Sequence, residues 1–231
     1  DLTMNGGLQM TINPNITIFG GTGDLTFRKL LPALYTMHVA GKLPENSRIL
    51  IIGRRDYDSA AYRETARNWV EKFTRLPFRP ADFQAFAGKI DYYRMDFSDH
   101  EAYRGLNRYY TGNRIGSHIF YFAVAPRFFS VITEGLKLVD GAKNGKVIIE
   151  KPFGEDLAAA KTLNGELEDY FGPEQIYRID HYLGKEMVRN IQAIRFTNPI
   201  FTDIWNSGHI ESVQISALED MGVETRGGYY D

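Results

Sequence analysis

The sequence ITIFGGTGDLT, residues 16–26, joins a short apolar run to the start of a helical pattern. Residues 16–19 are typical of a β-strand, and apolar side chains between residues 25 and 39 recur at the spacing of one helix face. Pro32 lies early enough in this predicted helix to be tolerated, and Gly41 is placed to end it. The stretch therefore predicts a strand, a glycine turn and a helix in succession.

The glycine turn matches a phosphate-binding pattern. Gly21, Gly23 and Thr26 fit G-x-G-x-x-small. Such a turn needs one residue free to take positive φ and another without a side chain, so that a pyrophosphate can approach the backbone. The helix N-terminus adds free amides and a partial positive charge. An ordinary tight turn is the alternative, but the position between a strand and a helix favours dinucleotide binding.

Short β-rich runs and longer helical patterns alternate as far as residue 179. The run at residues 48–52 is nearly all apolar, as strands covered on both faces are. This alternation predicts an α/β fold, a doubly wound parallel sheet. The predicted strands are residues 16–19, 48–52, 90–95, 118–124, 147–149 and 175–179. The predicted helices are residues 25–39, 59–73 (with Ser59 as N-cap), 99–110, 127–139 and 156–170.

Two arginines, Arg54 and Arg55, follow the second predicted strand. Domains that bind NAD usually carry an acidic residue there for the ribose hydroxyls, whereas arginine suits the 2′-phosphate of NADP. The pair therefore favours NADP, and a solvated surface pair is the alternative.

The pattern changes after Asp180. Residues 184–193 predict a helix, and residues 210–218 alternate like a half-exposed antiparallel strand. We place a boundary near Arg178, with a Rossmann-type domain at residues 14–178 and part of an α+β domain with an antiparallel sheet at residues 179–231. About fifty residues struggle to bury a core unaided, so this second domain is expected to be incomplete. Residues 1–13 are expected to be a leader, disordered or foreign to the native chain.

Composition limits the chemistry. Apolar residues make up 43% and charged residues 24%, the balance of a water-soluble globular protein. The net charge of −2 gives no overall basic field to attract nucleic acid. The absence of cysteine excludes disulfides, thiol nucleophiles and cysteine metal sites, and no metal site is predicted. No apolar run approaches the ~20 residues that span a bilayer and no secretory signal is visible, so we expect a cytoplasmic protein.

Two polar clusters come later in the chain. Lys151 lies in the sequence EKPFG, residues 150–154, at the carboxyl end of the fifth predicted strand, where such sheets bind ligands. A cis bond before Pro152 would redirect the chain there. The sequence RIDHYLGKE, residues 178–186, is the densest polar cluster, and its side chains at helical spacing would converge on one anion. The respective alternatives are an exposed lysine in a turn and a polar loop before a helix.

Taken together, these segments resemble the glucose-6-phosphate dehydrogenase family. The resemblance runs from about Ile16 to the last residue, and residues 178–186 are its most specific part. The matching blocks are residues 20–25, 28–35, 150–154, 178–186, 205–206, 209–210 and 227–231. The resemblance implies an NADP-dependent oxidation of the C1 hydroxyl of glucose 6-phosphate to 6-phosphogluconolactone, the first step of the oxidative pentose phosphate pathway.

The resemblance also implies roles for individual residues. Lys151 would contact both coenzyme and substrate, and Asp180 would orient the catalytic base. The remaining residues expected to bind NADP are Gly20, Gly21, Thr22, Gly23, Asp24, Leu25, Thr26 and Arg54. Those expected to bind the substrate, chiefly through its phosphate, are His181, Tyr182 and Lys185, with Glu219 as a sugar-binding carboxylate.

The sequence departs from the family pattern at two points. The family's base is a histidine a short way beyond the block at residues 227–231, and none of His38, His100, His118, His181 and His209 matches it. Phe27 stands where many members have a basic residue near the coenzyme. We therefore expect the 231-residue chain alone to be inactive. The resemblance also implies that the full-length enzyme is a homo-oligomer, a dimer or tetramer. The alternatives are a non-catalytic NADP-binding or sensing module and an oxidoreductase for another sugar phosphate.

Overall fold

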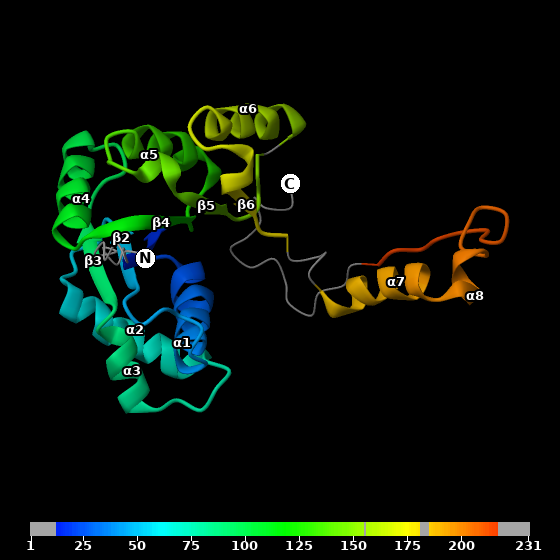
Figure 1. Ribbon diagram of the computed structural model, residues 1–231, viewed down its shortest axis with the longest axis horizontal. Helices are drawn as coiled ribbons and strands as arrows, with labels where there is room; N and C mark the ends of the chain where they lie inside the picture. Colours follow the sequence, from blue (N-terminus) through cyan, green and yellow to red (C-terminus); the bar gives the residue numbers. More distant parts are fainter. Residues whose placement is uncertain (1–12, 155, 181–184, 217–231) are drawn as a thin grey trace, which may run out of the picture. The chain divides into compact units, whose positions relative to one another are not determined.

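The computed structural model describes residues 13–154, 156–180 and 185–216, and the chain divides between Arg178 and Ile179 into two units. The first unit is built on a six-stranded parallel sheet with the order β3-β2-β1-β4-β5-β6 (Figure 1). The strands are β1 (Asn13–Phe19), β2 (Arg48–Gly53), β3 (Ile90–Arg94), β4 (Ile115–Phe122), β5 (Lys146–Ile149) and β6 (Ile176–Arg178).

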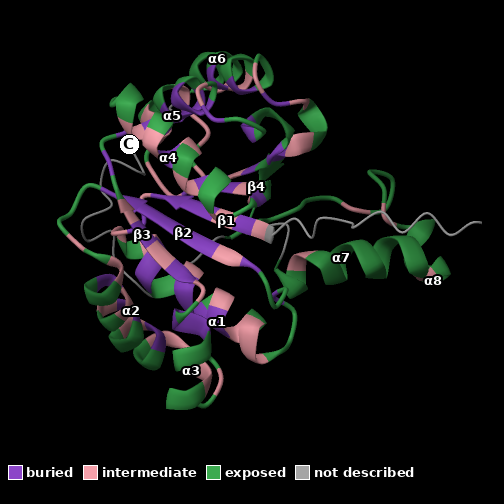
Figure 2. Cartoon of the chain, turned by 60° about the vertical axis from the view of Figure 1, so that its left-hand side comes forward, coloured by how far each residue is buried: buried purple, intermediate pink, exposed green. Residues whose placement is uncertain are grey.

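Helices cover both faces of this sheet. Helices α1, α2 and α3 lie on one face, and α4, α5 and α6 lie on the other (Figures 1 and 2). The predicted doubly wound α/β fold is thereby confirmed. The helical segments of this unit are η1 (Thr26–Leu30), α1 (Leu31–Val39), α2 (Ser59–Phe73), α3 (Pro80–Ala87), α4 (His100–Gly112), η2 (Pro126–Phe128), α5 (Phe129–Leu136), η3 (Ala142–Asn144), α6 (Leu157–Glu168) and η4 (Pro173–Gln175).

The central strands explain why the sheet carries two helical layers. In β2, Ile49, Leu50, Ile51 and Ile52 are all fully buried (Figure 2). Because successive side chains of a strand point to opposite faces, four consecutive buried residues require cover on both faces. Strand β1 lies between β2 and β4 and pairs with both. The chain runs outward from β1 to β2 and β3 on one side, then returns past β1 to form β4 on its other side. This reversal of strand order is the arrangement in which open α/β sheets form a ligand crevice.

The first helix begins with a π-helical turn. Pro32 has no backbone N–H and cannot donate to the carbonyl four residues earlier. The preceding residues form the π-helix η1, and the N–H of Leu31 donates to the carbonyl of Thr26. Pro32 is thus accommodated near the start of the helix, as predicted. Gly41 takes a φ of +66° just beyond α1, which confirms it as a helix-ending residue.

Some local predictions were wrong. The N-cap of α2 is Asp58, whose carboxylate accepts from the N–H of Ala61 at 2.8 Å. Ser59 instead accepts from the N–H of Tyr92 at 2.9 Å and so joins α2 to β3. Helix α3 was not predicted. Asn13, which we assigned to the leader, is the first residue of β1.

The second unit contributes two described helices, α7 (Glu186–Thr197) and α8 (Pro199–Thr202). Helix α7 starts and ends later than the helix predicted at residues 184–193. The antiparallel strand predicted at residues 210–218 was wrong for residues 210–216, which form no strand. A strand needs a neighbour to pair its N–H and C=O groups, and the described residues of this unit supply none. No described helix is both long and apolar enough to cross a membrane.

Candidate functional site

A cleft of about 440 Å³ opens at the carboxyl ends of β1, β2 and β4. Its position is the switch point of the sheet, where β1 is flanked by β2 and β4. The glycine turn, the end of β2 and the segment after β4 meet there. The first two were predicted to hold the coenzyme. The lining residues are Gly20, Thr22, Gly23, Gly53, Arg54, Arg55, Phe97, Ala123, Val124, Ala125 and Phe128.

The glycine turn passes so close to its neighbours that side chains would not fit. Gly20 takes a φ of +89°, and a Cβ added there would lie 2.2 Å from the carbonyl oxygen of Ala123. A Cβ on Gly21 would lie 2.0 Å from Cγ2 of Ile51. The residue with positive φ is therefore Gly20, one position before the first glycine of the matched pattern, while Gly21 provides the close approach to β2.

Thr26 shapes the turn without lining the cleft. Its side chain is fully buried, and Oγ1 donates to the carbonyl of Gly20 at 3.1 Å. The N–H of Phe27 donates to the carbonyl of Gly23 at 3.2 Å, so the helix grows directly out of the turn. Asp24 is exposed and pairs with Arg28 at 3.5 Å. Among the predicted turn residues, Gly20, Thr22 and Gly23 line the cleft, whereas Asp24, Leu25 and Thr26 do not.

Phe27 is a core residue. Its side chain is only 4% exposed and lies between the rings of Tyr62 and Trp69, at centroid distances of 5.5 and 5.6 Å. A basic residue at this position would lose both stacked contacts, which explains the departure from the family pattern in terms of packing.

The two arginines after β2 lie at the cleft with exposed side chains. Their backbone is fixed, because the carbonyl of Arg55 accepts from the hydroxyl of Tyr92 at 2.8 Å and from the N–H of Tyr57 at 3.0 Å. Hydrogen bonds from Ser98, together with the nearby guanidinium of Arg54, hold the pKa of Asp96 below its usual value. Two guanidinium groups are thus available at the cleft.

Gly53 brings the arginines close to the glycine turn. A Cβ on Gly53 would lie 3.0 Å from Cγ2 of Thr22 and 2.8 Å from the hydroxyl of Tyr92. Any side chain at this position would push the end of β2 away from the turn. Gly53 therefore lets the end of β2, which carries the two arginines, lie against Thr22 of the glycine turn.

Lys151 follows β5 at the same carboxyl edge of the sheet, one strand beyond β4. The Lys151–Pro152 peptide is cis, which confirms the geometry considered for this segment. The preceding carboxylate, Glu150, accepts from the hydroxyl of Tyr121 at 2.5 Å. Lys151 is half-buried and does not line the cleft that holds the glycine turn.

Apart from Lys151, the residues predicted to bind substrate or to orient the base fall in the second unit. Asp180 and Lys185 are exposed, and Lys185 is the N-cap residue of α7. His181, Tyr182 and Glu219 lie outside the described residues. Their roles therefore stay predictions.

Besides Gly53 at the end of β2, the sequence interpretation missed five cleft residues, Phe97, Ala123, Val124, Ala125 and Phe128. They follow β3 and β4, and the rule that ligands bind at the carboxyl ends of parallel strands would have found them. The rings of Phe97 and Phe128 meet edge to face at 5.6 Å and form an apolar wall. Such a wall suits the flat adenine or nicotinamide ring of a dinucleotide.

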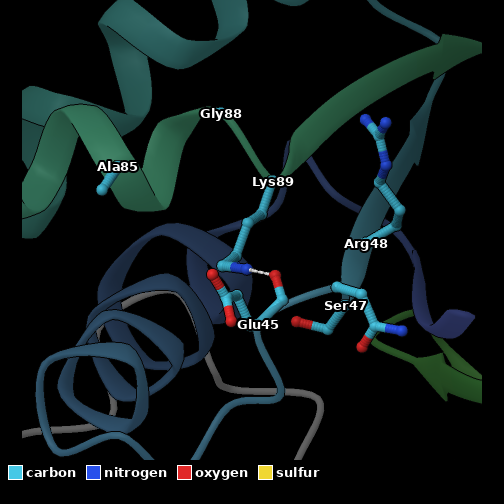
Figure 3. Close-up of a pocket in the computed structure, with 7 residues that line it drawn as sticks. Glu45, Ser47, Arg48, Ala85, Gly88 and Lys89 are labelled. Carbon is cyan, nitrogen blue, oxygen red and sulfur yellow. Dashed lines mark hydrogen bonds between the residues drawn. The ribbon is translucent and has the colours of Figure 1, made fainter.

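A second hollow, of about 410 Å³, lies at the opposite edge of the sheet (Figure 3). Its residues Ser47 and Arg48 stand at the amino end of β2, and Lys89 precedes β3. The ammonium group of Lys89 donates to the carbonyl of Glu45, as Figure 3 shows. Parallel α/β sheets bind ligands at their carboxyl edge, so this hollow is not the candidate site.

The fold and the cleft define a dinucleotide-binding domain of the kind found in oxidoreductases. A family model described as "Glucose-6-phosphate dehydrogenase, NAD binding domain" matches residues 17–190. A second, "Glucose-6-phosphate dehydrogenase, C-terminal domain", matches residues 192–231. The chain belongs to the glucose-6-phosphate dehydrogenase family, which confirms the resemblance, and its coenzyme belongs to the nicotinamide class.

Relatives of known name agree with this assignment. Glucose-6-phosphate 1-dehydrogenase of Gluconobacter oxydans is 41% identical over 222 residues, 93% of this chain and 45% of the relative. The enzyme of Leuconostoc mesenteroides is 40% identical over 225 residues, 94% of this chain and 46% of the relative. The chain therefore spans less than half the length of these relatives.

Solved structures show the same similarity. The glucose-6-phosphate 1-dehydrogenase of Mycobacterium avium matches with a TM-score of 0.82 and 32% identity, over 95% of this chain and 47% of that one. A glucose-6-phosphate dehydrogenase in complex with its substrate glucose-6-phosphate matches with a TM-score of 0.80 and 33% identity, over the same shares of the two chains.

Proposed function

We propose that this chain forms the coenzyme-binding part of an NADP-dependent glucose-6-phosphate dehydrogenase. The single observation that carries the proposal is the cleft that joins the glycine turn to Arg54 and Arg55. A turn of this kind offers amides to a pyrophosphate, and arginine offers a charged fork to a 2′-phosphate. When bound, the oxidised nicotinamide would accept a hydride from C1 of the sugar, whose C1 hydroxyl loses its proton as the lactone forms.

The residues of the chain divide this work between binding and orientation. The turn and the arginines would hold NADP, and Lys151 would contact coenzyme and substrate from the end of β5. His181, Tyr182 and Lys185 would hold the phosphate of the sugar. The relative solved with glucose-6-phosphate supports this choice of substrate, because the family motif that contains these residues is present here. Asp180 would orient a base and stabilise its cationic form.

The coenzyme proposal is tested by titrating the chain with NADP and with NAD. Replacing Arg54 by Ala removes a charge-assisted contact worth roughly 1.5–3 kcal/mol, which corresponds to about tenfold or more in affinity. We expect NADP binding to weaken by that factor and NAD binding to stay nearly unchanged. Arg67→Ala is the matched control, because it removes the same charge from an exposed position on α2 outside the cleft. Equal losses for the two coenzymes in Arg54→Ala would contradict the proposal.

A non-catalytic NADP-binding module is the second candidate, and the placement of the described histidines favours it for this chain alone. His38, His100 and His118 belong to the first unit, and none of them lines the cleft. His118 is 4% exposed and lies in the core of that unit. NADPH formation from glucose 6-phosphate by the full-length protein distinguishes the two candidates, since a binding module gives none.

A further inference from the structure

Two stacked tyrosines bind the backbone of two segments that border the coenzyme cleft, the glycine turn and the arginine segment. Tyr62 of α2 and Tyr92 of β3 have ring centroids 5.0 Å apart with an interplanar angle of 21°. The hydroxyl of Tyr62 donates to the carbonyl of Gly21 at 2.5 Å. The hydroxyl of Tyr92 donates to the carbonyl of Arg55 at 2.8 Å. One hydroxyl therefore holds the glycine turn and the other holds the arginine segment.

The stacked pair is enclosed by other aromatic rings. Tyr57 packs edge to face against Tyr62 at 5.9 Å and against Tyr92 at 5.7 Å. Phe27 also stacks on Tyr62 at 5.5 Å. Tyr62 is fully buried and Tyr92 is 9% exposed. Rings packed on several sides have little room to shift, so the positions of their hydroxyl groups are well defined.

Both hydroxyls remain hydrogen-bond donors near neutral pH. Burial raises the pKa of Tyr62 well above its usual value, and the neighbouring hydroxyls of Tyr92 and Tyr57 raise it further. Burial, followed by the charge of a deprotonated Tyr57, raises the pKa of Tyr92. Each group therefore keeps its proton and donates to a backbone carbonyl, which cannot donate in return.

We propose that Tyr62 and Tyr92 are positioning residues that set the spacing between the pyrophosphate site and the 2′-phosphate site, and through it the preference for NADP. The proposal rests on the proposed function. The pyrophosphate and the 2′-phosphate of NADP are joined through one ribose, so a protein gains from both only if its two sites are held at a matching separation. Backbone hydrogen bonds from the N–H groups of Gly20 and Gly21 to the carbonyl of Ile52 join the turn to β2, and the tyrosine pair adds a side-chain connection that extends to Arg55. Gly53 leaves the space for it, since a Cβ there would lie 2.8 Å from the hydroxyl of Tyr92.

The test replaces each tyrosine by phenylalanine, which keeps the ring and removes the hydroxyl. Coenzyme affinity is measured by titrating the 231-residue chain with NADP and with NAD. Tyr62→Phe should weaken both coenzymes by about 3- to 10-fold, since both carry the pyrophosphate. Tyr92→Phe should weaken NADP by the same factor and NAD by less than about twofold, because only NADP uses the arginine segment.

Tyr170→Phe is the matched control. Its hydroxyl also donates to a backbone carbonyl, that of Leu136 at 2.9 Å, but neither residue lines the cleft. It should lower the thermal stability of the chain and leave both affinities unchanged. In a background that lacks both arginines, Arg54→Ala with Arg55→Ala, the effect of Tyr92→Phe on NADP should disappear, because the groups that it positions are gone.

The outcomes separate this proposal from the one on which it rests. Failure of the unmodified chain to bind either coenzyme would overturn the proposed function. Normal binding with equal losses of NADP and NAD in Tyr92→Phe, or with no loss, would overturn the positioning role alone. An effect of Tyr92→Phe that persists in the arginine-free background would also overturn it, since the tyrosine would then act by another route.

Discussion

His118 contributes to the pH dependence of the stability of the first unit, and His118→Phe should remove this contribution. The imidazole is 4% exposed, stacks on Phe120 at 5.4 Å and meets the edge of Tyr110 at 4.7 Å. Neither ring nitrogen has a hydrogen-bond partner among the described residues. Burial without a partner disfavours the charged form and lowers the pKa of His118 to about 4. Phenylalanine keeps a planar ring at this place and cannot be protonated.

The size of the effect follows from the two pKa values. The unfolded chain has a histidine pKa of about 6.5, so between pH 6.5 and pH 4 the unfolded state binds more protons than the folded state. The stability that depends on a neutral His118 is therefore fully present above about pH 6.5, and it is lost progressively as the pH falls toward 4. The loss contributed by His118 is about 2 kcal/mol at pH 5 and about 3 kcal/mol once the pH reaches 4.

Urea unfolding at pH 7.5 and pH 5.0 measures this loss. A Trp205→Phe background leaves Trp69 as the only tryptophan, so fluorescence reports on the first unit. The free energy of unfolding should fall by about 2 kcal/mol more in the parent than in the His118→Phe variant over this pH range. Other titrating groups are common to both proteins and cancel in the difference. Equal losses in the two proteins would show that His118 is paired or hydrated, and the reasoning from its burial would fail.

Three further predictions concern the site. Gly20→Ala should cost about 2–5 kcal/mol of stability and abolish coenzyme binding, because the φ of residue 20 is positive and an added Cβ would lie 2.2 Å from the carbonyl oxygen of Ala123. An unchanged free energy of unfolding in urea would contradict this prediction. Lys185→Ala in the full-length enzyme should greatly raise KM for glucose 6-phosphate and matter far less for glucose, and steady-state kinetics showing equal effects would refute the phosphate assignment. The 231-residue chain should bind NADP without forming NADPH at a useful rate, since a general base is typically worth about 10²–10⁴-fold. Full-length-like turnover by the purified chain would show that a residue within it acts as the base.

Most of the fold could be predicted because periodicity and burial agree. Helix α2 has the bounds expected from its apolar spacing, and β2 is as apolar as its burial on both faces requires. Helix α3 was missed although its signals are present: Pro80 at the first position, an apolar face with Phe83 and Phe86, and Gly88 after the last turn. The strand expected at residues 210–218 shows the limit of an alternating pattern, since alternation cannot provide the second strand that a ladder needs.

The site could be predicted where its residues are local and not where distant segments meet. The glycine turn and Arg54 could be predicted because each lies within a few residues of the end of a strand that the sequence itself indicates. The hydroxyl bonds of Tyr62 and Tyr92 join residues that are 41 and 37 positions apart. In the sequence, both tyrosines have the spacing of ordinary core residues, and no local signal shows that their hydroxyl groups bind the carbonyls of Gly21 and Arg55.

The position of β1 at the middle of the sheet has a consequence for synthesis on the ribosome. Strand β1 can pair with β2 early, but its other edge pairs with β4, which ends at Phe122. The 70 residues between Ile52 and Phe122 (122 − 52) take about 4–14 s to translate. During that interval the apolar β1–β2 pair has an open edge, the kind of surface that pairs with other chains. We therefore expect the nascent chain to depend on chaperones most strongly between these two points, and slower growth at low temperature to improve its yield.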